Sequence, residues 1–164
     1  MPEATFSDTT NLAQKGIPST AQLKDEDELF AVYLDFDGKT TNDINRSYVW
    51  LLDKRSSTAN LVWTDSSYNI SNASIIPYTE PCRILAEGCP DMHNVFSFII
   101  NKELEPIMLP NNGGLVGFGR EEGVIIMQSY QYYQDGGRYS KIDAFDADGN
   151  KIASMNTNLK PKTP

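Results

Sequence analysis

Closely spaced turn signals in the second half of the chain constrain its fold more than any other feature. Four segments rich in Gly, Asp and Asn recur there: PNNGG at 110–114, GREEG at 119–123, QDGG at 134–137 and DADGN at 146–150. Asp-Gly and Gly-Gly pairs supply the positive φ angles that tight hairpin turns require. Parallel neighbours need crossovers of a dozen or more residues, so strands joined by such short segments must be antiparallel.

The segments between these turns have the composition of strands. They are rich in β-branched and aromatic residues and run over Leu115–Phe118, Val124–Tyr133, Tyr139–Phe145 and Lys151–Met155. In the first half, LFAVYLDF at 29–36 predicts another strand, and Tyr48–Leu52 with Asn60–Trp63 predicts a hairpin, with a helix beginning near Asp43 as the alternative. We predict a mainly β fold, as an antiparallel sheet, meander or sandwich, and leave open one or two short helices, which would make the fold α+β.

The length and the polar ends of the chain define its expected organisation. A chain of 164 residues suits one domain with tails. We expect a single β-rich domain over residues 28–156, a flexible N-terminal tether over 1–27 and a flexible tail over 157–164. The polar N-terminal segment resembles the tether that remains when an export signal or lipid anchor is removed. This favours a periplasmic or extracellular location and leaves a cytoplasmic one open.

The net charge restricts the partners that this chain can bind. It is −8, with a pI of about 4.6. Binding to nucleic acid requires a basic surface that displaces counterions, so we expect no nucleic-acid partner. No apolar run approaches the roughly 18 residues of a membrane span, so we expect none.

Two cysteines, Cys82 and Cys89, enclose six residues in CRILAEGC. Their spacing fits neither a Cys-x-x-Cys redox motif nor a zinc knuckle, and the chain has a single histidine. A local disulfide would fit an exported protein, and two buried thiols are the alternative. We expect the disulfide, and no resident cofactor or metal.

The string LDFDGKT, which places Asp35 and Asp37 beside Gly38, resembles the first motif of the haloacid dehalogenase-like phosphatases. The resemblance covers about ten of the 164 residues. It implies that Asp35 is a nucleophile toward phosphorus, that Asp37 is the acid for the leaving oxygen, and that magnesium offsets the charge. That family uses a parallel sheet, whereas the second half of this chain predicts antiparallel strands.

A second string, FDADGNK, repeats the same order of residues. Two such strings in different contexts favour two hairpins with the same turn chemistry, so we interpret Asp35 and Asp37 as turn-forming carboxylates. Clustered carboxylates also suit calcium, although neither string has the ligand spacing of an EF-hand loop.

The hairpin YQYYQDGGRY carries the strongest binding candidates, because tyrosine and arginine are enriched in surfaces that recognise proteins. Cross-strand aromatic pairing that stabilises the sheet is the alternative interpretation. Tyrosine and glutamine can also stack on, and hydrogen-bond to, a sugar. The candidate residues are Tyr130, Tyr132, Tyr133, Arg138 and Tyr139.

No convincing catalytic set is present, so the sequence favours a non-enzymatic protein and leaves enzymatic activity open. The leading hypothesis is an exported binding or interaction protein whose partner is another protein, such as an envelope inhibitor, an immunity-type protein or an adhesin module. The alternatives are a magnesium-dependent phosphatase that uses Asp35 and Asp37, and a carbohydrate- or calcium-binding β module.

Overall fold

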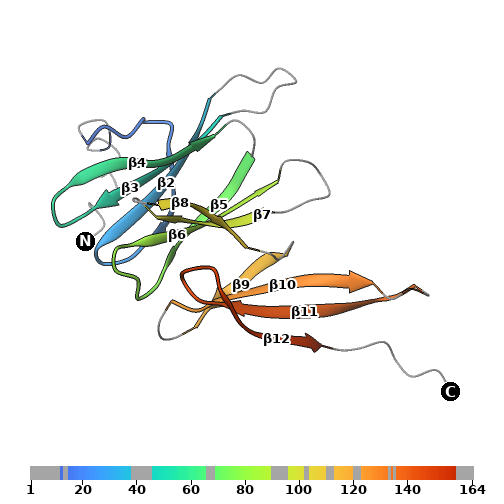
Figure 1. Cartoon of the computed structure of the whole chain (residues 1–164). Coiled ribbons are helices and arrows are strands. Elements are labelled where there is room, and N and C mark those ends of the chain that lie inside the picture. Colours follow the sequence, from blue (N-terminus) through green and yellow to red (C-terminus); the bar gives the residue numbers. More distant parts are fainter. Residues whose placement is uncertain are drawn as a thin grey trace, which may run out of the picture. The chain divides into compact units, whose positions relative to one another are not determined.

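The computed structural model describes residues 12, 15–37, 46–65, 69–89, 96–101, 104–109, 113–119, 123–132, 134 and 136–157. These residues form three four-stranded antiparallel sheets (Figure 1). The predicted mainly β, antiparallel fold is confirmed. Only Leu12 is helical among the described residues, so the α+β alternative finds no support there.

The strands follow one another along the chain. The first sheet has the order β1 (Gln22–Glu26), β2 (Phe30–Phe36), β3 (Ser47–Asp53) and β4 (Thr58–Asp65). The second has the order β5 (Asn69–Ile76), β6 (Arg83–Cys89), β7 (Phe96–Asn101) and β8 (Leu104–Met108). The third has the order β12 (Lys151–Thr157), β11 (Arg138–Phe145), β10 (Ile125–Tyr132) and β9 (Gly114–Phe118).

The chain forms two compact units, Met1–Ile75 and Ile76–Pro164. The expectation was a single domain over residues 28–156. The expected tether over 1–27 contains folded structure, because β1 occupies Gln22–Glu26 and Ile17 is 1% exposed. Residues 158–164 of the expected tail lie outside the described residues.

The first unit is organised around β2. All residues from Ala31 to Asp35 are buried, which indicates that both faces of this strand are covered. On one face, Ala31 and Tyr33 join Leu52 of β3 in an apolar cluster that Leu12, Ile17 and Ala21 complete from the N-terminal side.

A helix end holds the N-terminal side of this cluster in place. The backbone N–H of Ile17 donates to the carbonyl of Leu12 at 2.9 Å, and Gly16 has a φ of +86°. In the Schellman arrangement, a glycine with a positive φ ends the helix, and the N–H of the next residue bonds to the carbonyl five residues earlier. The two residues that this bond joins also make an apolar contact. Leu12 and Ile17 belong to the same cluster, as this arrangement requires.

The second unit has a core to which the β6–β7 strands and the β9–β12 sheet both contribute. Its fully buried members include Leu85, Ile99, Ile125, Met127 and Phe145. The β10–β11 pairing is regular from Ile125 opposite Phe145 to Tyr132 opposite Arg138, which confirms the long hairpin that the sequence predicts.

The Asp146 carboxylate holds the turn between β11 and β12. Its Oδ1 atom accepts hydrogen bonds from the backbone N–H groups of Asp148 (3.0 Å) and Asn150 (2.9 Å), and its Oδ2 atom accepts one from Asn150 Nδ2 at 3.2 Å. Gly149 has a φ of +86°, and a Cβ there would lie 2.5 Å from Ile107 Cγ2. The string FDADGNK is therefore a hairpin turn.

Opposing effects act on the pKa of Asp146. Burial alone would raise this pKa, but the hydrogen bonds from Asn150 and Asp148, together with the nearby Arg83 guanidinium, outweigh it. The pKa of Asp146 consequently lies below its ordinary value.

Replacing Asp146 with alanine should lower the free energy of unfolding by about 1 kcal/mol at neutral pH, because the turn loses its acceptor. The folded pKa is depressed, so this contribution is present above the unfolded pKa of about 3.9 and is lost as the pH falls through the folded value. Urea unfolding at neutral pH and at about pH 2 should show the difference between the two proteins shrinking in acid. An equal difference at both pH values would contradict a role for the charged carboxylate.

Candidate binding surface on the C-terminal sheet

The two faces of the β9–β12 sheet differ in burial. Ile125, Met127 and Phe145 point into the core of the second unit, and each is 0% exposed. Successive residues of a strand point to opposite faces, so Ile126, Gln128 and Tyr130 share the other face, and none of them is fully buried. We call this second face the outer face.

The register arranges the outer face in rows that cross three strands. Gln128 lies opposite Ile142, and Ile142 lies opposite Met155. Residues directly opposite in an antiparallel pair share a face, so this row extends from β10 to the open side of β12. Tyr130 of the neighbouring row is 51% exposed and Met155 is 58% exposed. Gln128 Nε2 donates to Ser140 Oγ at 3.1 Å and links the two rows.

Strand β12 is the end strand of its sheet, and every residue from Lys151 to Asn156 is exposed. Edge strands are usually protected by charged side chains, proline or bulges. The register shift of β12 lies at its start, where Phe145 pairs with Lys151, and the pairing is regular from Ala153 to Thr157.

The charge at the start of β12 is directed toward the inner face. The Lys151 Nζ atom lies 3.5 Å from Oδ1 of Asp143, a carboxylate that is 1% exposed on the inner face. Lys141 Nζ lies 3.9 Å from the other oxygen of Asp143. Between Ile152 and Thr157 the edge carries no charged residue and no proline.

Two of the candidate tyrosines in this hairpin lie on different faces. Tyr130 pairs with Ser140, whereas Tyr139 pairs with Gln131, the next position along β10. Tyr130 and Tyr139 therefore lie on opposite faces of the hairpin. The backbones of Tyr132 and Arg138 pair with each other, and Tyr133 lies outside the described residues.

Asp35 and Asp37 occupy different environments at the end of β2. Asp35 is a buried strand residue whose Oδ1 accepts a hydrogen bond from Thr20 Oγ1 at 2.8 Å, so its interpretation as a turn carboxylate is wrong. Asp37 follows the strand, and its N–H donates to the Arg46 carbonyl at 3.0 Å, extending the β2–β3 ladder. Gly38 lies outside the described residues.

A tyrosine hydroxyl binds the second carboxylate. Tyr48 OH donates to Asp37 Oδ1 at 3.0 Å. Burial raises the pKa of Tyr48, and the hydrogen bond to Asp37 and the charge of Asp37 raise it further, so the hydroxyl stays protonated as a donor at neutral pH. Because β2 pairs antiparallel with both β1 and β3, its end lacks the parallel neighbours that the phosphatase interpretation requires.

The expected disulfide between Cys82 and Cys89 is not formed, and Cys82 is a buried thiol. Strand β6 runs from Arg83 to Cys89, so all the residues between the two cysteines are extended. An extended strand rises about 3.3 Å per residue, which separates the two ends by roughly 20 Å. A disulfide requires Cα atoms within about 7 Å.

Two further properties bear on function. In the part of the chain that the structure describes, no three His, Cys, Asp or Glu side chains gather into a group that could hold a metal ion. The described residues also include no helix of the length and apolarity needed to cross a membrane. Comparison with models of known families and with curated proteins finds no match to this chain.

The outer face carries a signal in the sequence that the prediction did not use. Alternation in IIMQSYQY separates Ile125, Met127 and Ser129 from Ile126, Gln128 and Tyr130. The two isoleucines and the methionine conceal this alternation, because Ile126 is apolar although it lies on the outer face. The register with β11 and β12, which adds Ile142 and Met155, is not visible in β10 alone.

The role of Asp35 can be measured directly. Replacing Asp35 with alanine should lower the free energy of unfolding by about 1–3 kcal/mol, because the change removes a buried acceptor, and asparagine should cost less because it keeps an acceptor oxygen. Urea unfolding of the three proteins tests this order.

We also expect the unmodified protein with magnesium to show no turnover of p-nitrophenyl phosphate. Turnover that Asp35→Asn abolishes would instead support the phosphatase hypothesis.

Proposed function

We propose that this chain is a non-enzymatic binding protein that docks another protein on the outer face and open edge of its β9–β12 sheet. The observation that carries the proposal is the exposure of β12 along its described side chains, on a sheet whose outer face also exposes Tyr130. The occupant that we propose is an extended segment of the partner, added to the sheet beside β12.

The backbone of β12 supplies the first part of this argument. Alternate N–H and C=O groups of an end strand point away from its neighbour and can pair with an incoming strand. The regular stretch from Ala153 to Thr157 presents these groups without a bulge. Strand addition of this kind uses backbone hydrogen bonds for affinity and alternate side chains for specificity.

The outer face supplies the side-chain contacts. A strand added beside β12 would extend the row that runs from Gln128 through Ile142 to Met155. Tyrosine and methionine are both enriched in protein interfaces, where each can bury a large apolar area. Tyr130 lies on the same face but on β10, separated from the added strand by β11 and β12, so it would contact only a part of the partner that reaches across the sheet.

We place this interaction in the periplasm or outside the cell. The support is the polar N-terminal composition alone, because Cys82 is a thiol and gives no evidence of an oxidising compartment. The partner should therefore be recovered from the cell envelope or the medium of the native source.

Replacing Met155 with lysine should abolish partner binding, because it places a charge in the proposed interface and at the strand edge. Leu61→Lys is the matched control, since Leu61 is another strand residue with an exposed apolar side chain (43%) in the first unit. Both positions are exposed, so each change should alter the free energy of unfolding by less than about 0.5 kcal/mol.

The measurement is quantitative affinity capture from separate cytosolic, envelope and medium fractions with the unmodified protein and both variants. We expect one protein that the unmodified chain and Leu61→Lys enrich equally and that Met155→Lys fails to retain. Equal recovery by Met155→Lys would remove the outer face as the binding surface. Recovery only from the cytosolic fraction would contradict the proposed location.

A further inference from the structure

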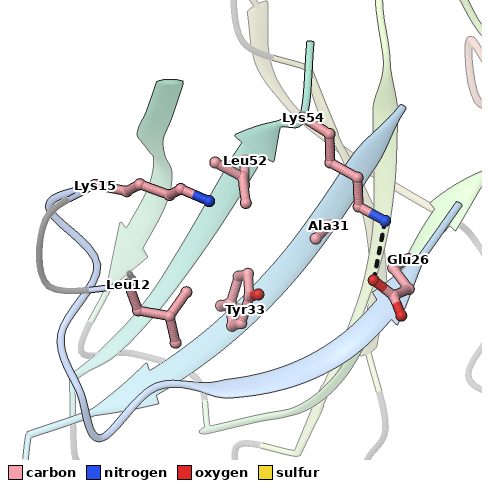
Figure 2. Close-up of a pocket in the computed structure, with 7 residues that line it drawn as sticks. All are labelled: Leu12, Lys15, Glu26, Ala31, Tyr33, Leu52 and Lys54. Atoms are coloured by element: carbon pink, nitrogen blue, oxygen red, sulfur yellow. Dashed lines mark hydrogen bonds and ion pairs between the residues drawn. The ribbon is translucent and has the colours of Figure 1, made fainter. Parts of the chain in front are cut away.

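A cavity of about 290 Å³ lies in the first unit, whereas the surface proposed above belongs to the second. Figure 2 shows Leu52, Tyr33 and Ala31 between two lysine side chains, which extend from opposite sides of the cavity. Among the residues that the structure describes, the cavity is lined by Leu12, Lys15, Glu26, Ala31, Tyr33, Leu52 and Lys54.

The floor of the cavity is apolar because it is one face of the β2–β3 pair. Ala31 lies opposite Leu52 across the two strands, and Tyr33 follows two residues later on the same face. Leu12 closes the floor from the N-terminal side, where the hydrogen bond to Ile17 holds it. Each of the four floor residues is at most 7% exposed, so an apolar ligand group placed here would leave water but would cover little apolar surface of the protein.

The rim carries one positive charge in excess, from two lysines and one glutamate. Lys54 already uses its ammonium, because Nζ lies 3.0 Å from Glu26 Oε2 and donates to the Asp27 carbonyl at 2.7 Å. Lys15 makes no ion pair with any residue that the structure describes, and its ammonium is directed over the floor toward Leu52 (Figure 2).

The position of Lys15 is fixed by the helix end. Lys15 immediately precedes Gly16, and its own N–H donates to the Leu12 carbonyl at 3.1 Å. The same backbone arrangement that closes the apolar floor therefore places Lys15 at its edge, and the side chain extends over the floor (Figure 2). A cation held above an apolar surface in this way matches a ligand with one anionic end and one apolar end.

We propose that this cavity binds a small amphipathic carboxylate, with the carboxylate against Lys15 and the apolar chain on Leu12, Tyr33 and Leu52. A volume of about 290 Å³ is close to the lower limit of roughly 300 Å³ for ligand pockets, so the ligand is small. This site and the outer face lie in different units, and neither proposal depends on the other.

The test uses four molecules and the full chain. Octanoate supplies both the charge and the chain, octanamide lacks the charge, acetate lacks the chain, and octylamine reverses the charge. Amide chemical shifts in ¹⁵N–¹H NMR spectra report where each molecule binds. We expect octanoate to perturb the amides of Lys15, Ala31, Tyr33 and Leu52, with a dissociation constant of roughly millimolar order.

The charge and the chain should each contribute. Octanamide should bind about fivefold more weakly than octanoate, since it loses the ion pair with a partly exposed lysine, and acetate and octylamine should cause no saturable shift at these amides. Lys15→Met should weaken octanoate about fivefold while retaining the aliphatic stem. Lys24→Met removes the same charge from β1, at a position outside the cavity, and should leave the affinity unchanged.

Two results would overturn the proposal. The first is equal affinity of the unmodified chain for octanoate and octanamide, a comparison that does not depend on the folding of any variant. The second is octanoate binding that perturbs other regions and leaves these four amides unshifted. Equal weakening by Lys15→Met and Lys24→Met would show a general effect of net charge and would likewise contradict the site.

Discussion

The fold depends on aspartate side chains that accept backbone N–H groups at hairpin turns. Asp27 Oδ1 accepts from Leu29 and Phe30 at 2.8 and 2.7 Å between β1 and β2. Asp53 and Asp146 make equivalent bonds between β3 and β4 and between β11 and β12. Each of these three turns reverses the chain within a few residues, so the two strands that it joins pair antiparallel. Strand β2 pairs antiparallel with both β1 and β3, which leaves it no parallel neighbour in this sheet.

Much of the second unit could be predicted from the sequence because its turns are local. The string FDADGNK predicts its own hairpin, since Asp146 and Gly149 provide the acceptor and the positive φ within five residues. The resemblance of LDFDGKT to this string was only partly informative. Asp37 does continue the ladder beyond β2, but Asp35 is buried by a long-range contact with Thr20, which no local pattern reveals.

The candidate sites were harder to predict because each depends on residues that are distant in sequence. The tyrosine-rich hairpin suggested binding candidates, but only the pairing with β11 and β12 shows that Tyr130 and Tyr139 lie on opposite faces and that Met155 lies in the row next to Tyr130. In the N-terminal segment, polar composition concealed the helix-end pattern of Leu12, Gly16 and Ile17, in which two apolar residues flank a left-handed glycine. The average polarity of such a segment hides the few apolar residues that decide whether it folds.

The two faces of the β9–β12 sheet differ in what they bury. The inner face buries Ile125, Met127 and Phe145 and gives the second unit its core, while the outer face and the end strand β12 retain unused apolar area and backbone pairing groups. Since Lys151 is turned toward Asp143, the usual charge protection of an edge strand is weakened where the pairing is most regular.

The most direct test of this account is photo-crosslinking from the outer face. A benzophenone amino acid placed at Met155 of the full chain, in its native source, should give one discrete adduct with another protein upon irradiation. The same group at Leu61 should give none, although both positions are exposed on strands. Absence of an adduct from position 155, or identical adducts from both positions, would contradict a binding role for the outer face.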